Sequence, residues 1–151
     1  MKTFLLILTL TITFLGCSHN NAFDRFEITP EQELSEDNIQ STKIKKGDLV
    51  KGIMTAVYLN KVHPKLYNNG EYFYISFYVE DQNQSLDFFL NEIPAIMVEE
   101  LERKNEFTEL TSFKAEWQKY YLVGFKKQDN VLNISVQSDQ FSAESLKFLK
   151  D

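Results

Sequence analysis

Residues 72–79 read Tyr-Phe-Tyr-Ile-Ser-Phe-Tyr-Val, and this stretch decides the fold class. Successive side chains of a strand point to opposite faces of a sheet, so the stretch has two distinct faces. One face carries Phe73, Ile75, Phe77 and Val79. The other carries Tyr72, Tyr74, Ser76 and Tyr78. We expect a strand from Tyr72 to Glu80, which is the clearest strand signal in a mainly β domain.

Alternating apolar residues predict further strands on both sides of this stretch. A long strand precedes it, apolar on both faces and ended by His63-Pro64, and Gly52 would permit a bend or bulge there. Asn68-Asn69-Gly70 is a turn signal between the two strands. Later strands are expected from Leu86 to Leu90, from Trp117 to Lys126 and from Val131 to Gln137.

Two segments show helical rather than alternating spacing. In residues 93–104, Pro94 suits a first helical turn, and Ile93, Ile96, Met97 and Leu101 follow at helical spacing. Ser142 is a suitable N-cap for a second short helix that contains Leu146, Phe148 and Leu149. The sequence thus predicts one helix between the third and fourth strands of the chain and one at the C-terminal side.

The resulting order is strand, strand, strand, helix, strand, strand. Over about residues 45–139 this order resembles the OB-fold, a small five-stranded barrel with a helix between its third and fourth strands. The resemblance implies such a barrel, followed by the short C-terminal helix. The alternative is an immunoglobulin-like β-sandwich, which would need about seven shorter strands.

The first 17 residues have the features of an export signal. Met1-Lys2 is followed by an uncharged stretch up to Leu15, which is shorter than the roughly 20 residues that span a bilayer. The sequence Phe14-Leu15-Gly16-Cys17 resembles the lipobox of bacterial lipoproteins, although Phe14 stands where leucine is more usual. The resemblance implies removal of residues 1–16 as a signal peptide and lipid attachment to Cys17.

This resemblance also implies a location and a domain order. Residues 17–41 would be the lipidated N-terminus and a flexible tether, since they are polar and acidic, and residues 42–151 would form a single β-rich domain. Acyl chains on Cys17 would hold the protein on an extracytoplasmic membrane surface. In a cell with two membranes, Ser18 after the lipidated cysteine favours the periplasmic face of the outer membrane.

Composition excludes several classes of function. The formal net charge of −6 repels phosphate backbones, so we expect no nucleic-acid partner. Cys17 is the only cysteine and there are two histidines, too few for a zinc site. No nucleophile elbow or phosphate-binding glycine loop occurs. We therefore expect no catalytic residues, no metal and no cofactor, and a protein that is not an enzyme.

Four tyrosines form the candidate binding face. Tyr72, Tyr74 and Tyr78 share one strand face, and Tyr120 is expected nearby. OB-folds bind ligands on this part of the barrel, where aromatic rings stack on bases or sugars. The alternative is that these rings pack beneath the tether or the terminal helix. The predicted function is binding, either of a protein in an envelope assembly or of an extracytoplasmic oligosaccharide.

Overall fold

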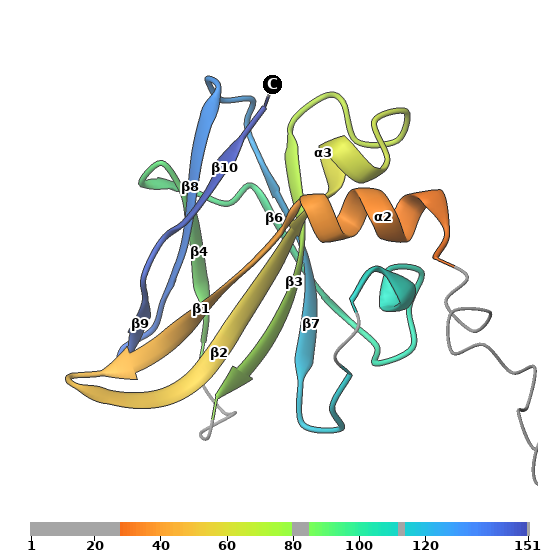
Figure 1. Ribbon diagram of the computed structural model, residues 1–151. Helices are drawn as coiled ribbons and strands as arrows, with labels where there is room; N and C mark the ends of the chain where they lie inside the picture. The colour runs from red at the N-terminus through yellow and green to blue at the C-terminus, as the bar shows by residue number, and fades with distance from the viewer. Residues whose placement is uncertain (1–27, 80–84, 112–113, 151) are drawn as a thin grey trace, which may run out of the picture.

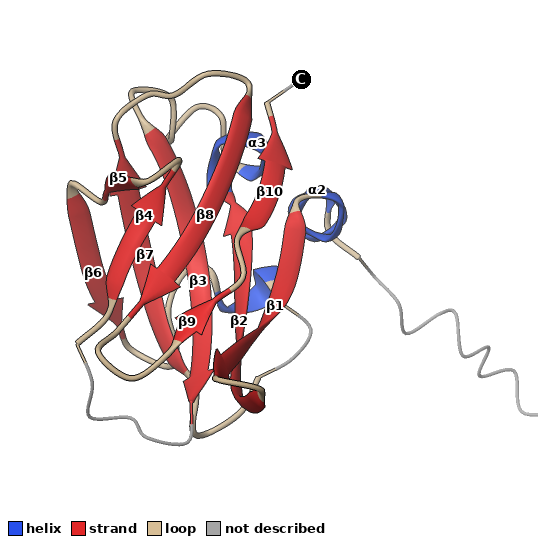
Figure 2. Cartoon of the chain, turned by 90° about the vertical axis from the view of Figure 1, so that its left-hand side faces the viewer, coloured by secondary structure: helices blue, strands red, loops and turns tan. Residues whose placement is uncertain are grey.

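The structure is a computed structural model of the 151-residue chain, and it describes residues 28–79, 85–111 and 114–150. The lipobox and Cys17 lie outside these ranges. The described chain is mainly β, with all strand pairs antiparallel (Figures 1 and 2). Its elements are α2 (Pro30–Asp37), β1 (Ile39–Lys46), β2 (Leu49–Tyr58), α3 (Leu59–Val62), β3 (Glu71–Val79), β4 (Asp87–Leu90), β5 (Ile93–Pro94), β6 (Met97–Leu101), η2 (Thr108–Leu110), β7 (Lys119–Phe125), β8 (Val131–Gln137), β9 (Ser142–Ala143) and β10 (Leu146–Leu149).

A single curled sheet contains all ten strands. Its order is β5-β4-β8-β9-β1-β2-β3-β7-β6, and β10 pairs with β8. Residues 93–101 connect the two edges of the sheet, because β5 pairs with β4 at one edge and β6 pairs with β7 at the other. Ala95 N donates to Phe88 O at 2.9 Å, and the next amide, Ile96 N, donates to Gly124 O at 2.9 Å. The curl therefore brings both ends of the sheet to one segment.

The inside of the curl holds the main core, which we call the inner cluster. It takes alternate residues from nearly every strand, as expected for one buried face of each. Full burial of a large apolar side chain contributes roughly 1.5–3 kcal/mol. The largest contributors with less than 2 % exposure are Phe73, Phe125, Ile44, Met54, Ile75, Leu90, Leu132 and Ile134.

A second, outer cluster lies on the other face of β2, β3 and β7. It contains Val57, Leu59, Val62, Tyr74, Phe107, Leu110 and Tyr120. Helix α2 joins this side through Ser35, whose buried hydroxyl donates to Leu110 O at 2.6 Å. Strand β3 is thus buried on both faces, and only Tyr72 and Tyr78 within it are partly exposed.

Residues 30–41 are ordered, in contrast to the predicted flexible tether. Thr29 and Gln32 form a capping box: Gln32 N donates to Thr29 Oγ1 and Thr29 N donates to Gln32 Oε1. Pro30 occupies the first helical turn, where its missing N–H costs no hydrogen bond. Helix α2 follows, and β1 then pairs with β2 from Ile39 onward. The remaining tether residues before 28 lie outside the described chain.

The helix predicted over residues 93–104 is wrong. This segment forms β5, β6 and the start of a loop. Its apolar residues have helical spacing, but Ile93 and Ile96 are 42 % and 62 % exposed, so no buried helical face exists. Strand pairing with β4 and β7 outweighs the local pattern, and Pro94 is tolerated because β5 is an edge strand.

The predicted C-terminal helix is also wrong, because residues 142–149 form β9 and β10. Leu146 and Phe148 are buried while Lys147 and Leu149 are exposed, which is the two-residue period of a strand. The expected mainly β class is confirmed. The five-strand count of the OB-fold is not matched, and the strands form one sheet rather than the two of an immunoglobulin-like sandwich. The described residues contain no helix long and apolar enough to cross a bilayer.

The irregularity expected at Gly52 is confirmed. The β1–β2 register shifts between Ile44, which pairs with Gly52, and Lys45, which pairs with Val50. A Cβ on Gly52 would lie 2.0 Å from the backbone oxygen of Tyr78, so no side chain fits between β2 and β3 there. The close approach of the two strands depends on this glycine.

Replacement of Gly52 should therefore be far more costly than replacement of Gly47. We expect Gly52→Ala to lower the free energy of unfolding by more than about 2 kcal/mol, because a backbone atom must move. Gly47 has φ +60° but open space around its Cβ position, so Gly47→Ala should cost about 1 kcal/mol. Urea unfolding of both variants measures this, and equal losses would contradict it.

Candidate functional site

The four predicted tyrosines do lie together on the outer face of β3 and β7. Tyr74 and Tyr120 have nearly parallel rings, with centroids 6.0 Å apart and an angle of 4° between the planes. Tyr72 and Tyr78 occupy the two ends of the same face of β3. The alternation of residues 72–79 therefore predicted the shared face.

Two of these tyrosines are covered by other parts of the chain. Tyr74 and Tyr120 are 0 % and 2 % exposed in the outer cluster. Phe107 packs on Tyr74 with ring centroids 5.3 Å apart, and Tyr120 donates its hydroxyl to Gln118 Oε1 at 3.1 Å. A ligand reaches neither ring unless this cover moves, so both rings serve packing in the described arrangement.

Burial also sets the chemistry of Tyr74. Removal from water raises the pKa of Tyr74 to about 12, and the buried hydroxyl has no hydrogen-bond partner within the described chain. The phenol therefore keeps its proton at neutral pH. It is not suited to act as a base or nucleophile.

The accessible part of the tyrosine face lies toward the β1–β2 hairpin. Tyr78 contacts Trp117 edge-on, with ring centroids 6.1 Å apart, and Ile53 is its cross-strand partner on β2. Ile53 and Trp117 are 51 % and 54 % exposed. The hairpin carries further exposed apolar residues at its end and reaches beyond the rest of the sheet at the lower left of Figure 1. We call Ile53, Tyr78 and Trp117 the apolar strip. Leu49 and Val50 lie at the end of the same hairpin and are also exposed.

Lysines lie along the β1 side of the apolar strip. Lys43 is exposed and directly opposite Ile53 in the β1–β2 ladder. Lys45 pairs with Glu144 at 2.6 Å, where the lysine holds the pKa of that exposed carboxyl below its usual range. The strip thus has a basic border in a chain of net negative charge. Such a surface fits a partner whose apolar patch is bordered by acidic groups.

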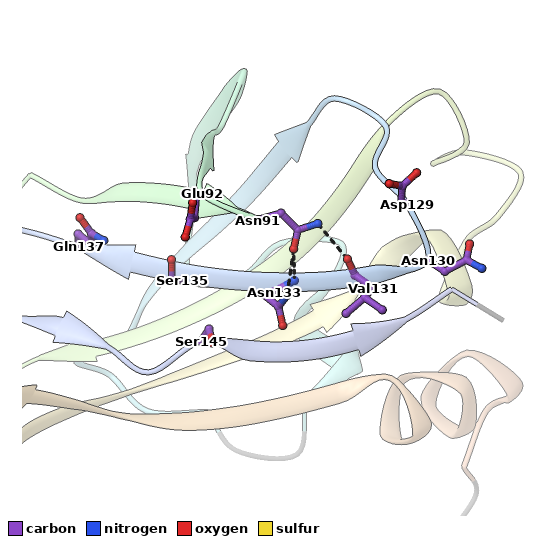
Figure 3. A pocket seen from close by; sticks show the side chains of 9 residues that line it. All are labelled: Asn91, Glu92, Asp129, Asn130, Val131, Asn133, Ser135, Gln137 and Ser145. Atoms are coloured by element: carbon purple, nitrogen blue, oxygen red, sulfur yellow. Dashed lines mark hydrogen bonds between the residues drawn. The ribbon is translucent and has the colours of Figure 1, made fainter.

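A second concave surface lies elsewhere, over the outward face of β8. It is lined by amide, hydroxyl and carboxylate side chains (Figure 3). No sequence pattern indicates it, because the residues come from three separate segments of the chain.

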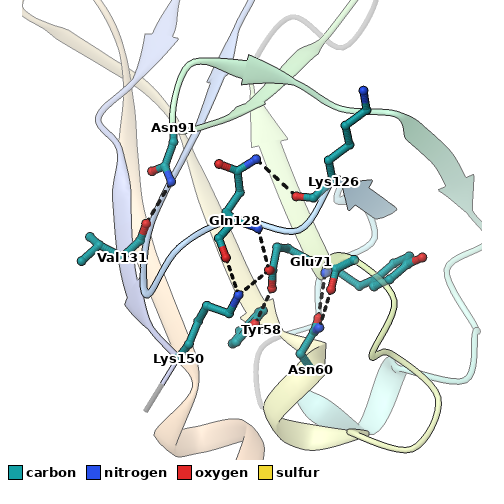
Figure 4. A network of polar contacts seen from close by, with 10 residues as sticks. Tyr58, Asn60, Glu71, Asn91, Lys126, Gln128, Val131 and Lys150 are labelled. Atoms are coloured by element: carbon teal, nitrogen blue, oxygen red, sulfur yellow. Dashed lines mark hydrogen bonds and ion pairs between the residues drawn. The ribbon is translucent and has the colours of Figure 1, made fainter.

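A buried ion pair closes one end of the curled sheet (Figure 4). Glu71, which is 1 % exposed, accepts hydrogen bonds from Lys150 Nζ at 2.6 Å, Tyr58 OH at 2.6 Å and Gln128 N at 3.0 Å. Burial and the contact with Glu71 raise the pKa of Tyr58 above its usual range, so Tyr58 remains a donor. Asn60 adds a bridge from α3, donating to Gly70 O and accepting from Tyr72 N.

This network stabilises the fold and does not resemble a ligand-binding site. All of the Glu71 partners come from the ends of strands or from the loop after β7, so the ion pair ties β2, β3 and the residue after β10 together. The adjoining pocket has a volume of about 240 Å³, below the usual range of about 300–1,000 Å³ for ligand sites. Among the described residues, no three His, Cys, Asp or Glu side chains are grouped to hold a metal ion.

Loss of Lys150 should therefore destabilise the protein through Glu71. We expect Lys150→Met to lower the free energy of unfolding by about 3 kcal/mol, because it leaves a buried carboxylate without its counter-charge. Adding Glu71→Gln to that variant should restore part of the stability, since a neutral amide still bonds Tyr58. Urea unfolding at pH 7 tests this, and an equal loss in the double variant would contradict the assignment to Glu71.

Comparison with known proteins identifies no family for this chain. No protein-family model, curated protein or solved structure matches it.

Proposed function

We propose that this chain is a lipid-anchored binding protein of the bacterial cell envelope, and that its apolar strip docks another envelope protein. The observation that carries the docking proposal is the exposure of large apolar side chains in one place. Ile53 and Trp117 are each more than half exposed beside Tyr78, and Leu49 and Val50 add exposed apolar side chains at the end of the hairpin. The anchor is supported by the resemblance of residues 14–17 to a lipobox.

The composition of the strip supports a protein as its partner. Exposed apolar residues that gather in one place mark interaction surfaces more often than scattered ones do. Trp and Tyr are enriched in protein interfaces, where their rings supply large contact areas at low entropic cost. The lysine border adds selectivity for an acidic rim on the partner. Tyr78 and Trp117 are the residues that we expect to contribute most to binding.

Binding of an oligosaccharide to the tyrosine face gains no support. Two of the four rings are buried beneath Phe107 and Leu110, and a buried ring offers no face on which a sugar could stack. Only Tyr78 combines partial exposure with a neighbouring exposed aromatic ring.

Site-specific crosslinking in cells tests the docking surface. A photo-crosslinking residue at position 53 should capture one dominant envelope protein, and Trp117→Ser should reduce that product at least about tenfold. Position 66 provides the matched control, because Leu66 is exposed and lies in the loop before β3. Capture of the same protein from position 66, or capture of nothing but a second copy of this chain, would contradict the proposal.

Cys17→Ser tests the anchor independently. The variant should lose incorporation of an alkyne-tagged fatty acid and leave the membrane fraction, because two or three acyl chains supply the membrane affinity. The β domain should keep its unfolding midpoint. Retention of the fatty-acid label in Cys17→Ser would show that the lipid is attached to another residue and would contradict the proposal.

A further inference from the structure

A polar hollow lies over the outward face of β8, on a different part of the sheet from the apolar strip. Its volume is about 1120 Å³. Leu132, Ile134 and Val136 of β8 point into the inner cluster, so the alternate residues Asn133, Ser135 and Gln137 face the hollow. Glu92, from the turn after β4, and Ser145, from the break between β9 and β10, border it on either side of β8 (Figure 3).

The lining defines the charge and polarity of a ligand. Amides, hydroxyls and two carboxylates, Glu92 and Asp129, surround the hollow, and Val131 is an apolar residue at its edge. Among the residues that the structure describes, no lysine or arginine lines the hollow. Phosphate and carboxylate ligands are therefore disfavoured, whereas a neutral ligand with many hydroxyl groups finds both donors and acceptors.

Several polar groups of the lining remain available to a ligand. Within the described chain, the side chains of Ser135, Gln137 and Ser145 have no hydrogen-bond partner. Because residues two apart on a strand repeat at about 6.6–6.8 Å, Asn133, Ser135 and Gln137 present a row of groups longer than one small molecule. The row faces an open surface rather than a packed neighbour.

The turn that carries Glu92 has a strained backbone. Asn91 and Glu92 have φ values of +48° and +67°, which two-residue hairpin turns of this kind require. Glycine adopts this conformation without strain, but a non-glycine residue pays of order 1 kcal/mol or more. Asn91 holds the turn against β8: its side chain accepts from Asn133 N and donates to Val131 O, both at 2.9 Å. The carboxylate of Glu92 is thereby kept beside the hollow.

Strand addition by a peptide is blocked at this site. A peptide that extends a sheet needs a free strand edge. β8 pairs with β4 along one edge and with β9 and β10 along the other, and Asn91 bonds the stretch beyond β4. Recognition in the hollow must therefore use side chains alone, as it does for sugar hydroxyls.

From these observations we propose that the polar hollow binds a neutral oligosaccharide. Its volume lies above the usual range of about 300–1,000 Å³ for small-molecule sites, which favours several sugar units over one. The amide of Gln137, the carboxylate of Glu92 and the side-chain oxygen of Asn133 bond the hydroxyl groups; the Asn133 amide nitrogen donates to Asn91 Oδ1. This activity is separate from the proposed protein docking, because the two surfaces share no residue.

Binding to a panel of neutral hexasaccharides tests the proposal. The panel contains glucose, galactose, mannose and N-acetylglucosamine hexamers, titrated by isothermal calorimetry and saturation-transfer NMR against the protein in a detergent without a sugar headgroup. At least one hexamer should bind with a dissociation constant below about 1 mM. Its affinity should fall at least about tenfold in Ser135→Trp, whose indole ring occupies the middle of the hollow, and about threefold or more in Glu92→Gln.

Two variants guard against a change in folding. Gln137→Ala removes only an exposed amide and should weaken binding while the unfolding midpoint is unchanged. Asp139→Asn removes an exposed carboxylate outside the hollow and should leave binding unchanged. No binding to any hexamer, or binding that Ser135→Trp and Gln137→Ala leave unaltered, would overturn the proposal. Crosslinking from position 53 does not depend on this result, so the two proposals fail separately.

Discussion

Strand β3 is apolar on both of its faces, and this constraint determines what packs around it. Phe73, Ile75 and Phe77 point to one side and Tyr74 to the other, so each side needs a cover. The curl of the sheet covers the first side, since strands from both halves of the chain meet across the inner cluster. Helices α2 and α3 and the η2 segment cover the second. A flat sheet would leave one of these surfaces in water.

Different parts of the chain cover the two faces of β3, and this difference determines which apolar surfaces remain exposed. The inner cover is built from sheet strands and encloses its face completely. The outer cover consists of short segments that extend over Tyr74 and Tyr120 but stop before Tyr78 and Ile53. The apolar strip is therefore the uncovered remainder of a larger apolar face. The polar hollow has a different origin. Apart from Val131, the residues of β8 that line it are polar.

Local patterns in the sequence predicted the strands better than the connections between them. Residues 72–79 and 131–137 alternate cleanly, and the structure places strands there. The helix prediction for residues 93–101 was wrong because pairing with β4 and β7 fixes their conformation, and the spacing of apolar residues does not show such pairing. The capping box in Thr29-Pro30-Glu31-Gln32 is a local signal for the start of helix α2. The acidic composition of the same segment is typical of a flexible tether, so composition alone gives the wrong structure here.

The candidate sites also combine features that local sequence patterns predict with contacts between distant segments that they do not. Alternation placed Tyr72, Tyr74 and Tyr78 on one face, but their burial depends on residues 35 and 107–110, which are far away in sequence. No pattern links Glu71 to Lys150, which are 79 residues apart. Contacts of this kind are set by the complete fold, so the sequence alone predicts which residues share a face and not which of them remain accessible.

The late position of β10 in the chain has a consequence for biosynthesis. β1, β2 and β3 follow one another and pair as neighbours, so they can assemble while the rest of the chain is still being made. Leu146 and Phe148 complete the inner cluster, and Lys150 neutralises Glu71, only at the end. At about 5–20 residues per second, synthesis of β10 follows that of β3 by several seconds, and a sheet formed from β1 to β3 in that time would expose its aromatic face. Such an intermediate is a natural client for a chaperone that holds chains unfolded.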